Sequence, residues 1–109
     1  MTAPHPPPIK LSALRDIGWK EWDPIGILPP GEIWDHQPFA DEYDRYLLAV
    51  AGGFRRGMSL EDATQYLLRA ARQQMGLSPH PLQIEQAAAT ARSIQRYMAE
   101  LDGRSPVSA

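Results

Sequence analysis

The stretch DEYDRYLLAVAGGFRRGMSLEDATQYLLRAARQQM, residues 41–75, decides the fold. It lies in a long interval without proline, from Phe39 to Ser78, which leaves room for continuous helices. Its first half has apolar residues at i, i+4, i+7, i+8 and i+11, the spacing of an amphipathic helix: Tyr43, Leu47, Val50, Ala51 and Phe54. Three acids begin this half and two arginines end it, which is the charge order that the helix dipole favours. We therefore expect a helix over residues 41–56.

The second half of this stretch predicts another helix, over residues 60–75. Ser59 is followed three residues later by Asp62, which is close to the capping-box pattern. The buried face should be formed by residues at helical spacing: Leu60, Ala63 or Thr64, Leu67, Ala71 and Met75. Gly76 stands where a left-handed glycine caps many helices. Because a short turn joins the two helices, they should form an antiparallel hairpin.

Two further helices are expected outside this hairpin. The first covers residues 12–22 with Ser12 as its N-cap, and it should end by Asp23 because the residue before a proline avoids the α region. The last covers residues 81–102, and its apolar residues alternate by three and four: Ile84, Ala87, Ala91, Ile94, Met98 and Leu101. Such a seam packs within the bundle or forms a homodimer through this fourth helix. The predicted fold class is all-α, a small bundle of about four helices.

The chain of 109 residues has the size of a single domain, and 43% hydrophobic with 22% charged residues is typical of a folded protein. We expect a disordered proline-rich lead over residues 1–10, one helical domain over 11–103 and a flexible tail over 104–109. Without cysteine, disulfides and thiol catalysis are excluded. No stretch has the apolar length of a signal peptide or a membrane span, which predicts a cytoplasmic protein without a membrane partner.

Residues 19–46 combine acids, prolines and all three tryptophans. Within them, residues 21–44 contain seven acids and neither Lys nor Arg, whereas the rest of the chain is mildly basic. We expect Trp19 and Trp22 to fill the core from the end of the first helix. Residues 23–39 should form a long ordered loop, rich in proline and tryptophan, between the first two helices. The acids either bind a basic partner or pair with the chain's own arginines.

This acidic, aromatic segment is the candidate functional site. Aromatic side chains anchor many protein interfaces, and carboxylates steer a basic partner toward its binding surface. The predicted partner-binding residues are Asp23, Trp34, Asp35, Asp41, Glu42, Asp44 and Tyr46. The leading hypothesis is a non-catalytic protein-interaction domain, such as an immunity or antitoxin-like inhibitor of a basic toxin.

The alternative is a small enzyme or metal-dependent domain centred on His36, with Asp35 and Asp44 nearby. The sequence has no His-x-x-x-His or Glu-x-x-His pair, no G-x-S-x-G elbow and no phosphate-binding glycine loop. We therefore expect no catalytic residue, no metal site and no cofactor. Arginines recur at positions 69 and 72 and at 92 and 96, but no nucleic-acid recognition motif accompanies them. They should be solvated helix faces, which argues against a nucleic-acid partner.

Four motifs stand out along the chain. They are W-K-E-W-D-P-I-G-I from residue 19, D-E-Y-D-R-Y from residue 41, R-R-G-M-S-L-E-D-A from residue 55 and Q-M-G-L from residue 74. Together they resemble a family of small uncharacterised bacterial proteins, a domain of unknown function, over about residues 14–77 and a helix beyond. The resemblance implies an all-helical domain of a kind linked with toxin immunity or other accessory roles. The proline-rich front and residues 28–39 extend beyond the family's pattern.

Overall fold

The computed structural model describes residues 7–23, 26, 28, 29, 31–74 and 81–103. Its α-helices are α1 (Leu11–Ile17), α2 (Asp44–Arg55), α3 (Leu60–Arg69) and α4 (Pro81–Leu101). The π-helical turns η1 (Gly18–Trp22) and η3 (Ala70–Gln74) extend α1 and α3, and a 3-10 turn, η2 (Trp34–His36), lies between η1 and α2. No strand occurs in the described ranges, and the predicted all-α bundle of about four helices is confirmed.

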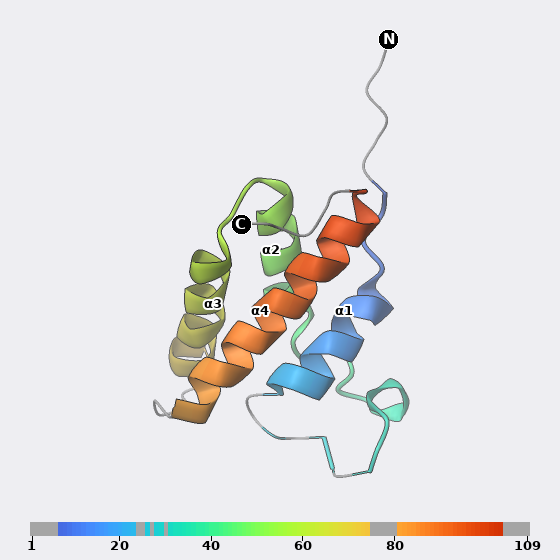
Figure 1. Cartoon of the computed structure of the whole chain (residues 1–109). Helices are drawn as coiled ribbons and strands as arrows, with labels where there is room; N and C mark the ends of the chain where they lie inside the picture. The colour runs from blue at the N-terminus through green and yellow to red at the C-terminus, as the bar shows by residue number, and fades with distance from the viewer. Residues whose placement is uncertain (1–6, 24–25, 27, 30, 75–80, 104–109) are drawn as a thin grey trace.

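Helix α4 is the central element of the bundle. It crosses the front of the molecule in Figure 1, between α3 and α1, with α2 behind it. It contacts all three of these helices and η1. Its inner face is buried and consists mainly of small side chains, which let the other helices approach closely: Ala87, Thr90, Ala91, Ile94 and Met98. Ala87 and Ala91 of the predicted seam are therefore covered by the chain's own helices, whereas Ile84, predicted for the same seam, is 50% exposed.

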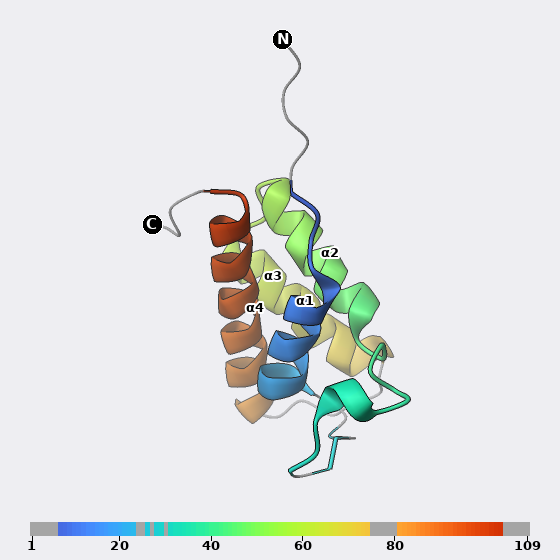
Figure 2. The ribbon, with the colours of Figure 1, turned by 90° about the vertical axis from the view of Figure 1, so that its right-hand side faces the viewer.

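Helices α2 and α3 form the expected hairpin, with α3 running back beside α2 (Figures 1 and 2). Gly57 in the turn has a φ of 94°, which glycine adopts without strain. The Ser59 hydroxyl accepts a hydrogen bond from the backbone N–H of Asp62 at 3.0 Å, so the predicted N-cap is confirmed. The predicted cap at Gly76 lies outside the described residues.

Two glycines in helical turns are points of close packing. A Cβ at Gly18 would lie 2.8 Å from Cδ1 of Leu47, so the missing side chain lets η1 approach α2. A Cβ at Gly53 would lie 2.2 Å from Cε of Met58. Gly53 in α2 therefore makes room for the Met58 side chain from the following turn.

The first helix differs from its prediction at its start and in the type of its last turn. It begins at Leu11 with Lys10 as N-cap, so Ser12 is not the cap. After Ile17 the backbone widens into η1, which ends before Asp23 as predicted. Trp19 and Trp22, on η1, are 4% and 3% exposed, which confirms that both belong to the core.

The last residues of the predicted disordered lead are held against the bundle. Ile9 packs on the core, and the backbone N–H of Lys10 donates to the Tyr97 hydroxyl at 2.9 Å. Arg55 donates to the carbonyl oxygen of Pro7 and, at 2.7 Å, to the carboxylate of Asp102. The remainder of the lead, residues 1–6, and the predicted tail, residues 104–109, lie outside the described residues.

Candidate functional site

Residues 31–42, which we call the acidic arm, project beyond the end of α1 at the lower right of Figure 2. Successive turns fix the arm's backbone through hydrogen bonds from an N–H group to the carbonyl oxygen three residues earlier. These bonds run from Gln37 to Trp34 at 3.0 Å, from Ala40 to Gln37 at 3.2 Å and from Glu42 to Phe39 at 3.0 Å. The turns continue through residue 43. For this reason α2 begins at Asp44, and the prediction that Asp41 and Glu42 form its first turn is wrong.

Two indole groups fasten the acidic arm to the helices. The Nε1–H of Trp19 donates to the carbonyl oxygen of Ala40 at 3.1 Å. The Nε1–H of Trp34 donates to the Asp16 carboxylate at 3.1 Å, while the half-buried ring of Trp34 packs against the core. The described residues of the arm are thus held in place from both η1 and α1.

A cluster of aromatic rings packs together where the arm joins η1 and α2. The ring centroids of Trp19 lie 5.5 Å from Phe39 and 4.6 Å from Tyr43, and those of Trp22 lie 5.3 Å from Tyr43 and 5.9 Å from Tyr46. Tyr46 is only 7% exposed. The prediction that Tyr46 binds a partner is therefore not supported, because its position three residues after Tyr43 places both rings on the inner face of α2.

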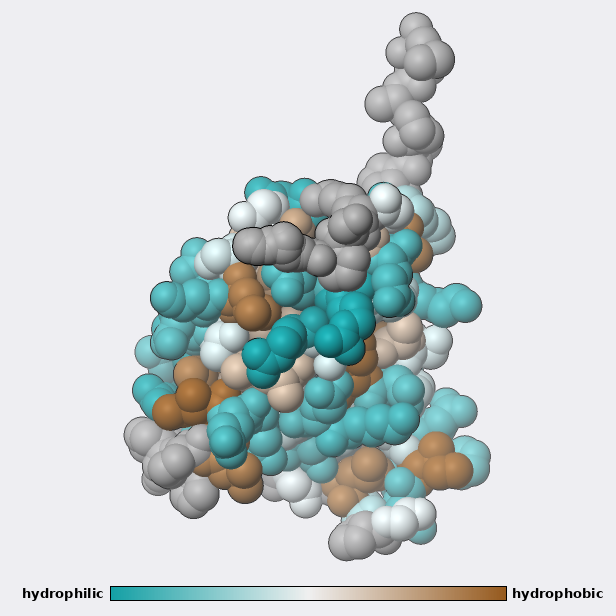
Figure 3. All heavy atoms as spheres, in the orientation of Figure 1, coloured by the Kyte–Doolittle hydropathy of each residue, from teal (hydrophilic) through white to brown (hydrophobic). Residues whose placement is uncertain are grey.

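The outer side of the acidic arm presents carboxylates and one apolar side chain to solvent. Its exposed acids are Glu32, Asp35, Asp41 and Glu42. Among them Ile33 is 56% exposed. Figure 3 shows apolar areas among hydrophilic residues at the lower right of the molecule. Three of the predicted partner-binding acids thus lie together on one accessible segment.

Asp23, a fourth predicted partner-binding acid, is instead occupied within the fold. Its Oδ1 accepts hydrogen bonds from the Tyr43 hydroxyl at 2.8 Å and from the backbone N–H of Gly26 at 3.2 Å. Its Oδ2 accepts from the backbone N–H of Leu28 at 3.4 Å. Among the described residues it is the one non-glycine with a positive φ, 25°, a conformation that Asp tolerates better than most residues. Asp23 therefore fixes the start of the loop to α2.

Asp44, the fifth predicted acid, is paired with Arg15 of α1. The Arg15 guanidinium donates from Nε to Oδ1 at 2.9 Å and from Nη2 to Oδ2 at 2.6 Å. These hydrogen bonds, partly opposed by burial, raise the pKa of Arg15, and the charges of Asp41 and Asp35 raise it further. The acidic segment thus pairs with one of the chain's own arginines at its end, while the arm keeps its exposed carboxylates.

His36, the centre of the enzyme or metal alternative, lies exposed in η2. Asp44 is bound to Arg15, so it is not a free ligand beside the imidazole. No group of three or more His, Asp or Glu side chains in the described ranges is arranged to hold a metal ion. Arg69, Arg72, Arg92 and Arg96 are exposed, as expected for solvated helix faces.

Sequence reasoning missed three residues that shape this site. Arg15 and Asp16 come from α1, and each bonds to a residue of the acidic segment at least 18 positions away. Nothing in the local pattern indicates such a pairing. The third is Ile33, and an isoleucine between Glu32 and Trp34 in an irregular segment is a signal for an exposed contact residue.

Comparison of the chain with protein-family models gave no match, and neither curated proteins nor solved structures gave a significant one. Within the described part of the chain, no helix combines the length and apolarity needed to cross a membrane. The site must therefore be interpreted from its own geometry and charge.

Proposed function

We propose that this chain is a non-catalytic protein-interaction domain that binds a basic partner through the acidic arm. One observation carries the proposal: the acidic arm carries four exposed carboxylates and an isoleucine that is 56% exposed, on a backbone that successive turns already fix. An exposed apolar side chain provides buried contact area on binding, and the carboxylates steer and orient a positively charged partner.

The fixed geometry of the arm favours binding. Trp19 and Trp34 hold it by hydrogen bonds to Ala40 and Asp16, and Phe39 packs on the Trp19 ring. Because these contacts exist in the free chain, less conformational entropy is lost when a partner binds.

The chain's own cations near the arm are already matched by its own acids. Arg15 is bound to Asp44, and the amino group of Lys20 lies 3.7 Å from the Asp16 carboxylate. Residues 21–44 contain no Lys or Arg. The exposed carboxylates of the arm therefore form a negatively charged surface, which favours a basic partner.

Partner capture by two matched variants of the full-length chain tests the proposal. The arm variant carries E32Q, D35N and E42Q, and the control carries E61Q, E85Q and E100Q, three exposed acids of α3 and α4. Both lose three negative charges. Asp41 is left unchanged because its charge raises the pKa of Arg15 more than that of Asp35 does.

We expect wild type and control to capture the same basic protein from the host, and the purified partner to bind the arm variant about tenfold or more weakly. Added salt should weaken the wild-type complex, since the charges involved are exposed. Equal affinity of the arm variant and the control would contradict the proposal, as would a captured partner that is acidic.

A narrower form of the proposal is an immunity or antitoxin-like inhibitor of a basic toxin. It is supported by the acidic arm and by the resemblance of the W-D-P-I-G and D-E-Y-D motifs to a bacterial family linked with toxin immunity. The test is co-expression with a toxin encoded beside the gene. Wild type and the control variant should restore growth and the arm variant should not; growth arrest with wild type present would exclude this form.

A further inference from the structure

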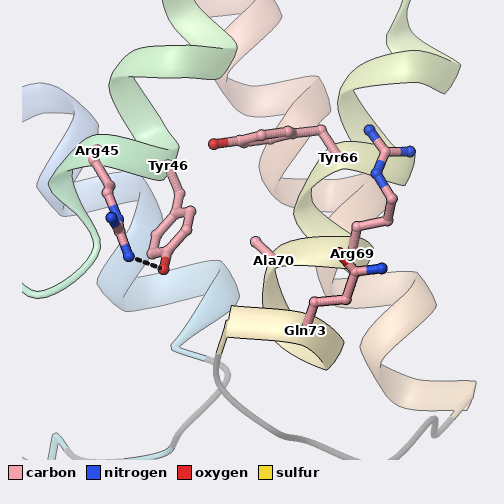
Figure 4. Close-up of a pocket in the computed structure, with 6 residues that line it drawn as sticks. All are labelled: Arg45, Tyr46, Tyr66, Arg69, Ala70 and Gln73. Carbon is pink, nitrogen blue, oxygen red and sulfur yellow. Dashed lines mark hydrogen bonds between the residues drawn. The ribbon is translucent and has the colours of Figure 1, made fainter.

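A pocket of about 300 Å³ lies between α2 and the α3–η3 segment, and its described lining includes no residue of the acidic arm. Its lining residues are Arg45, Tyr46, Tyr66, Arg69, Ala70 and Gln73. Figure 4 shows Arg45 and Tyr46 reaching in from α2 and the Tyr66 hydroxyl pointing toward them from α3. The volume is near the lower end for small-molecule sites, which suits a ligand with a single ring.

The polar groups around this pocket are mainly hydrogen-bond donors. Two guanidinium groups, two phenol hydroxyls and one amide belong to the described lining, and no carboxylate does. The Arg45 guanidinium is held at the wall, because its Nη2 donates to the Tyr46 hydroxyl at 2.9 Å and its Cζ lies 4.9 Å from the Tyr46 ring centroid. That hydrogen bond uses one of five N–H donors, so others remain for an anion.

Tyr66 connects the two arginines electrostatically. Burial raises the pKa of the Tyr66 phenol, and the charge of Tyr46 adds to this, while the charges of Arg45 and Arg69 act in the opposite direction. Both cations therefore lie within electrostatic reach of the Tyr66 hydroxyl, which stays protonated and able to donate at neutral pH. In Figure 4 the Arg69 guanidinium is turned away from Tyr46, and the Arg69 side chain is exposed.

The remaining walls are apolar. The Tyr46 ring is 7% exposed and the Ala70 methyl group is buried, while the Tyr66 ring is half-buried. Flat aromatic surfaces favour a planar ligand, and a guanidinium group favours a carboxylate or phosphate, which it binds with two parallel hydrogen bonds.

We propose that this pocket binds a small anion in which a carboxylate or phosphate is attached to a planar ring. The ring lies against Tyr46 and Tyr66, and the oxyanion accepts hydrogen bonds from Arg45 and the Tyr66 hydroxyl, joined by Arg69 once its exposed side chain rotates toward the ligand. This site is separate from the proposed partner surface, whose charge is of the opposite sign.

Titration of the full-length chain, followed by amide chemical shifts in NMR spectra, tests the site. The probes are phenyl phosphate, benzoate, inorganic phosphate and phenol, which separate the contributions of the ring and of each oxyanion. We expect saturable shifts confined to residues 45–46 and 66–73 with phenyl phosphate or benzoate. Inorganic phosphate and phenol should each bind about tenfold or more weakly, since each lacks one half of the ligand.

The variants R45Q and R69Q should each weaken binding of the better probe about tenfold. R92Q removes an exposed arginine of α4 outside the pocket and should leave the affinity unchanged. Y66F keeps the ring and removes the hydroxyl, so it should weaken binding less than either arginine variant. Absence of saturable shifts with every probe would overturn the proposal, as would equal binding by R45Q and R92Q. Shifts of the same residues on raising the concentration of protein alone would show a second copy in the pocket and would also overturn it.

Discussion

The two ends of the acidic segment, residues 21–44, differ from its middle. At the ends, the Asp23 carboxylate accepts a hydrogen bond from the Tyr43 hydroxyl at 2.8 Å, and the Asp44 carboxylate accepts two from the Arg15 guanidinium, at 2.6 and 2.9 Å. In the middle, the carboxylates of the acidic arm are exposed. The residues are of the same type throughout, so the difference lies in the donors that the helices place within reach.

This contrast separates stability from function. A carboxylate at a helix boundary faces donors that the bundle fixes in position, and its removal leaves those donors without a charged acceptor. A carboxylate on an exposed turn is hydrated in the folded chain as it is in the unfolded chain. Its removal therefore changes the free energy of unfolding little. The ends of the segment should therefore determine folding, and the arm should determine binding.

The largest effect on stability is expected from Asp23→Ala. The change removes the charged acceptor of the buried Tyr43 hydroxyl and of two backbone N–H groups, and it places alanine at a φ of 25°. We expect the free energy of unfolding, measured in urea, to fall by about 2–3 kcal/mol.

Asp23→Asn is the matched control for this prediction. Its amide oxygen still accepts hydrogen bonds, and Asn tolerates a positive φ, so the loss should be about 1 kcal/mol. If Asp23→Ala and Asp23→Asn unfold at the same urea concentration as wild type, Asp23 belongs with the exposed acids and the contrast between ends and middle fails.

An intermediate effect is expected at the other end of the segment. The side chains of Arg15 and Asp44 are 25% and 18% exposed and form a bidentate salt bridge. A double-mutant cycle with R15Q and D44N should therefore give a coupling energy of about 1 kcal/mol. Lys20 and Asp16 provide the comparison within the same chain. They are 73% and 54% exposed and 3.7 Å apart, and the K20Q and D16N cycle should give about 0.3 kcal/mol or less. Equal couplings would show that geometry and burial do not distinguish the two pairs.

Much of the helical bundle could be predicted from periodicity alone. Tyr43, just before α2, and Leu47 and Val50 on its inner face are fully buried, and so are Ala87 and Ala91 of α4. These predictions hold because burial of one helix face depends on local spacing, which the sequence shows directly.

The start of α2 could not be predicted in this way. Charge order favoured Asp41, but Phe39 packs on Trp19 and the Trp19 indole binds the Ala40 carbonyl, which holds residues 37–43 in turns. These contacts join residues about twenty positions apart, and they outweigh the local dipole preference. The pairing of Asp44 with Arg15 is of the same kind: either residue alone is typical of a solvated surface.

The pocket between α2 and α3 also escaped prediction. Arg69 indicated only a solvated face, and Tyr46 was assigned to a partner surface on the basis of its acidic neighbours. Their meeting with Arg45 and Tyr66 depends on how the hairpin closes, which one sequence does not specify.

The smallest effect on stability is expected from the arm variant E32Q/D35N/E42Q. Its three carboxylates are exposed, and the one hydrogen bond described for them, from Gln37 Nε2 to Glu32 Oε1 at 3.2 Å, is itself exposed. The glutamine that replaces Glu32 still offers an amide oxygen to that donor. The free energy of unfolding should therefore change by no more than about 0.5 kcal/mol, and the E61Q/E85Q/E100Q control should behave alike. A loss near that of Asp23→Ala would mean that the middle of the segment also holds the fold together. An unchanged stability combined with lost partner binding would assign the two parts of one acidic segment to different tasks.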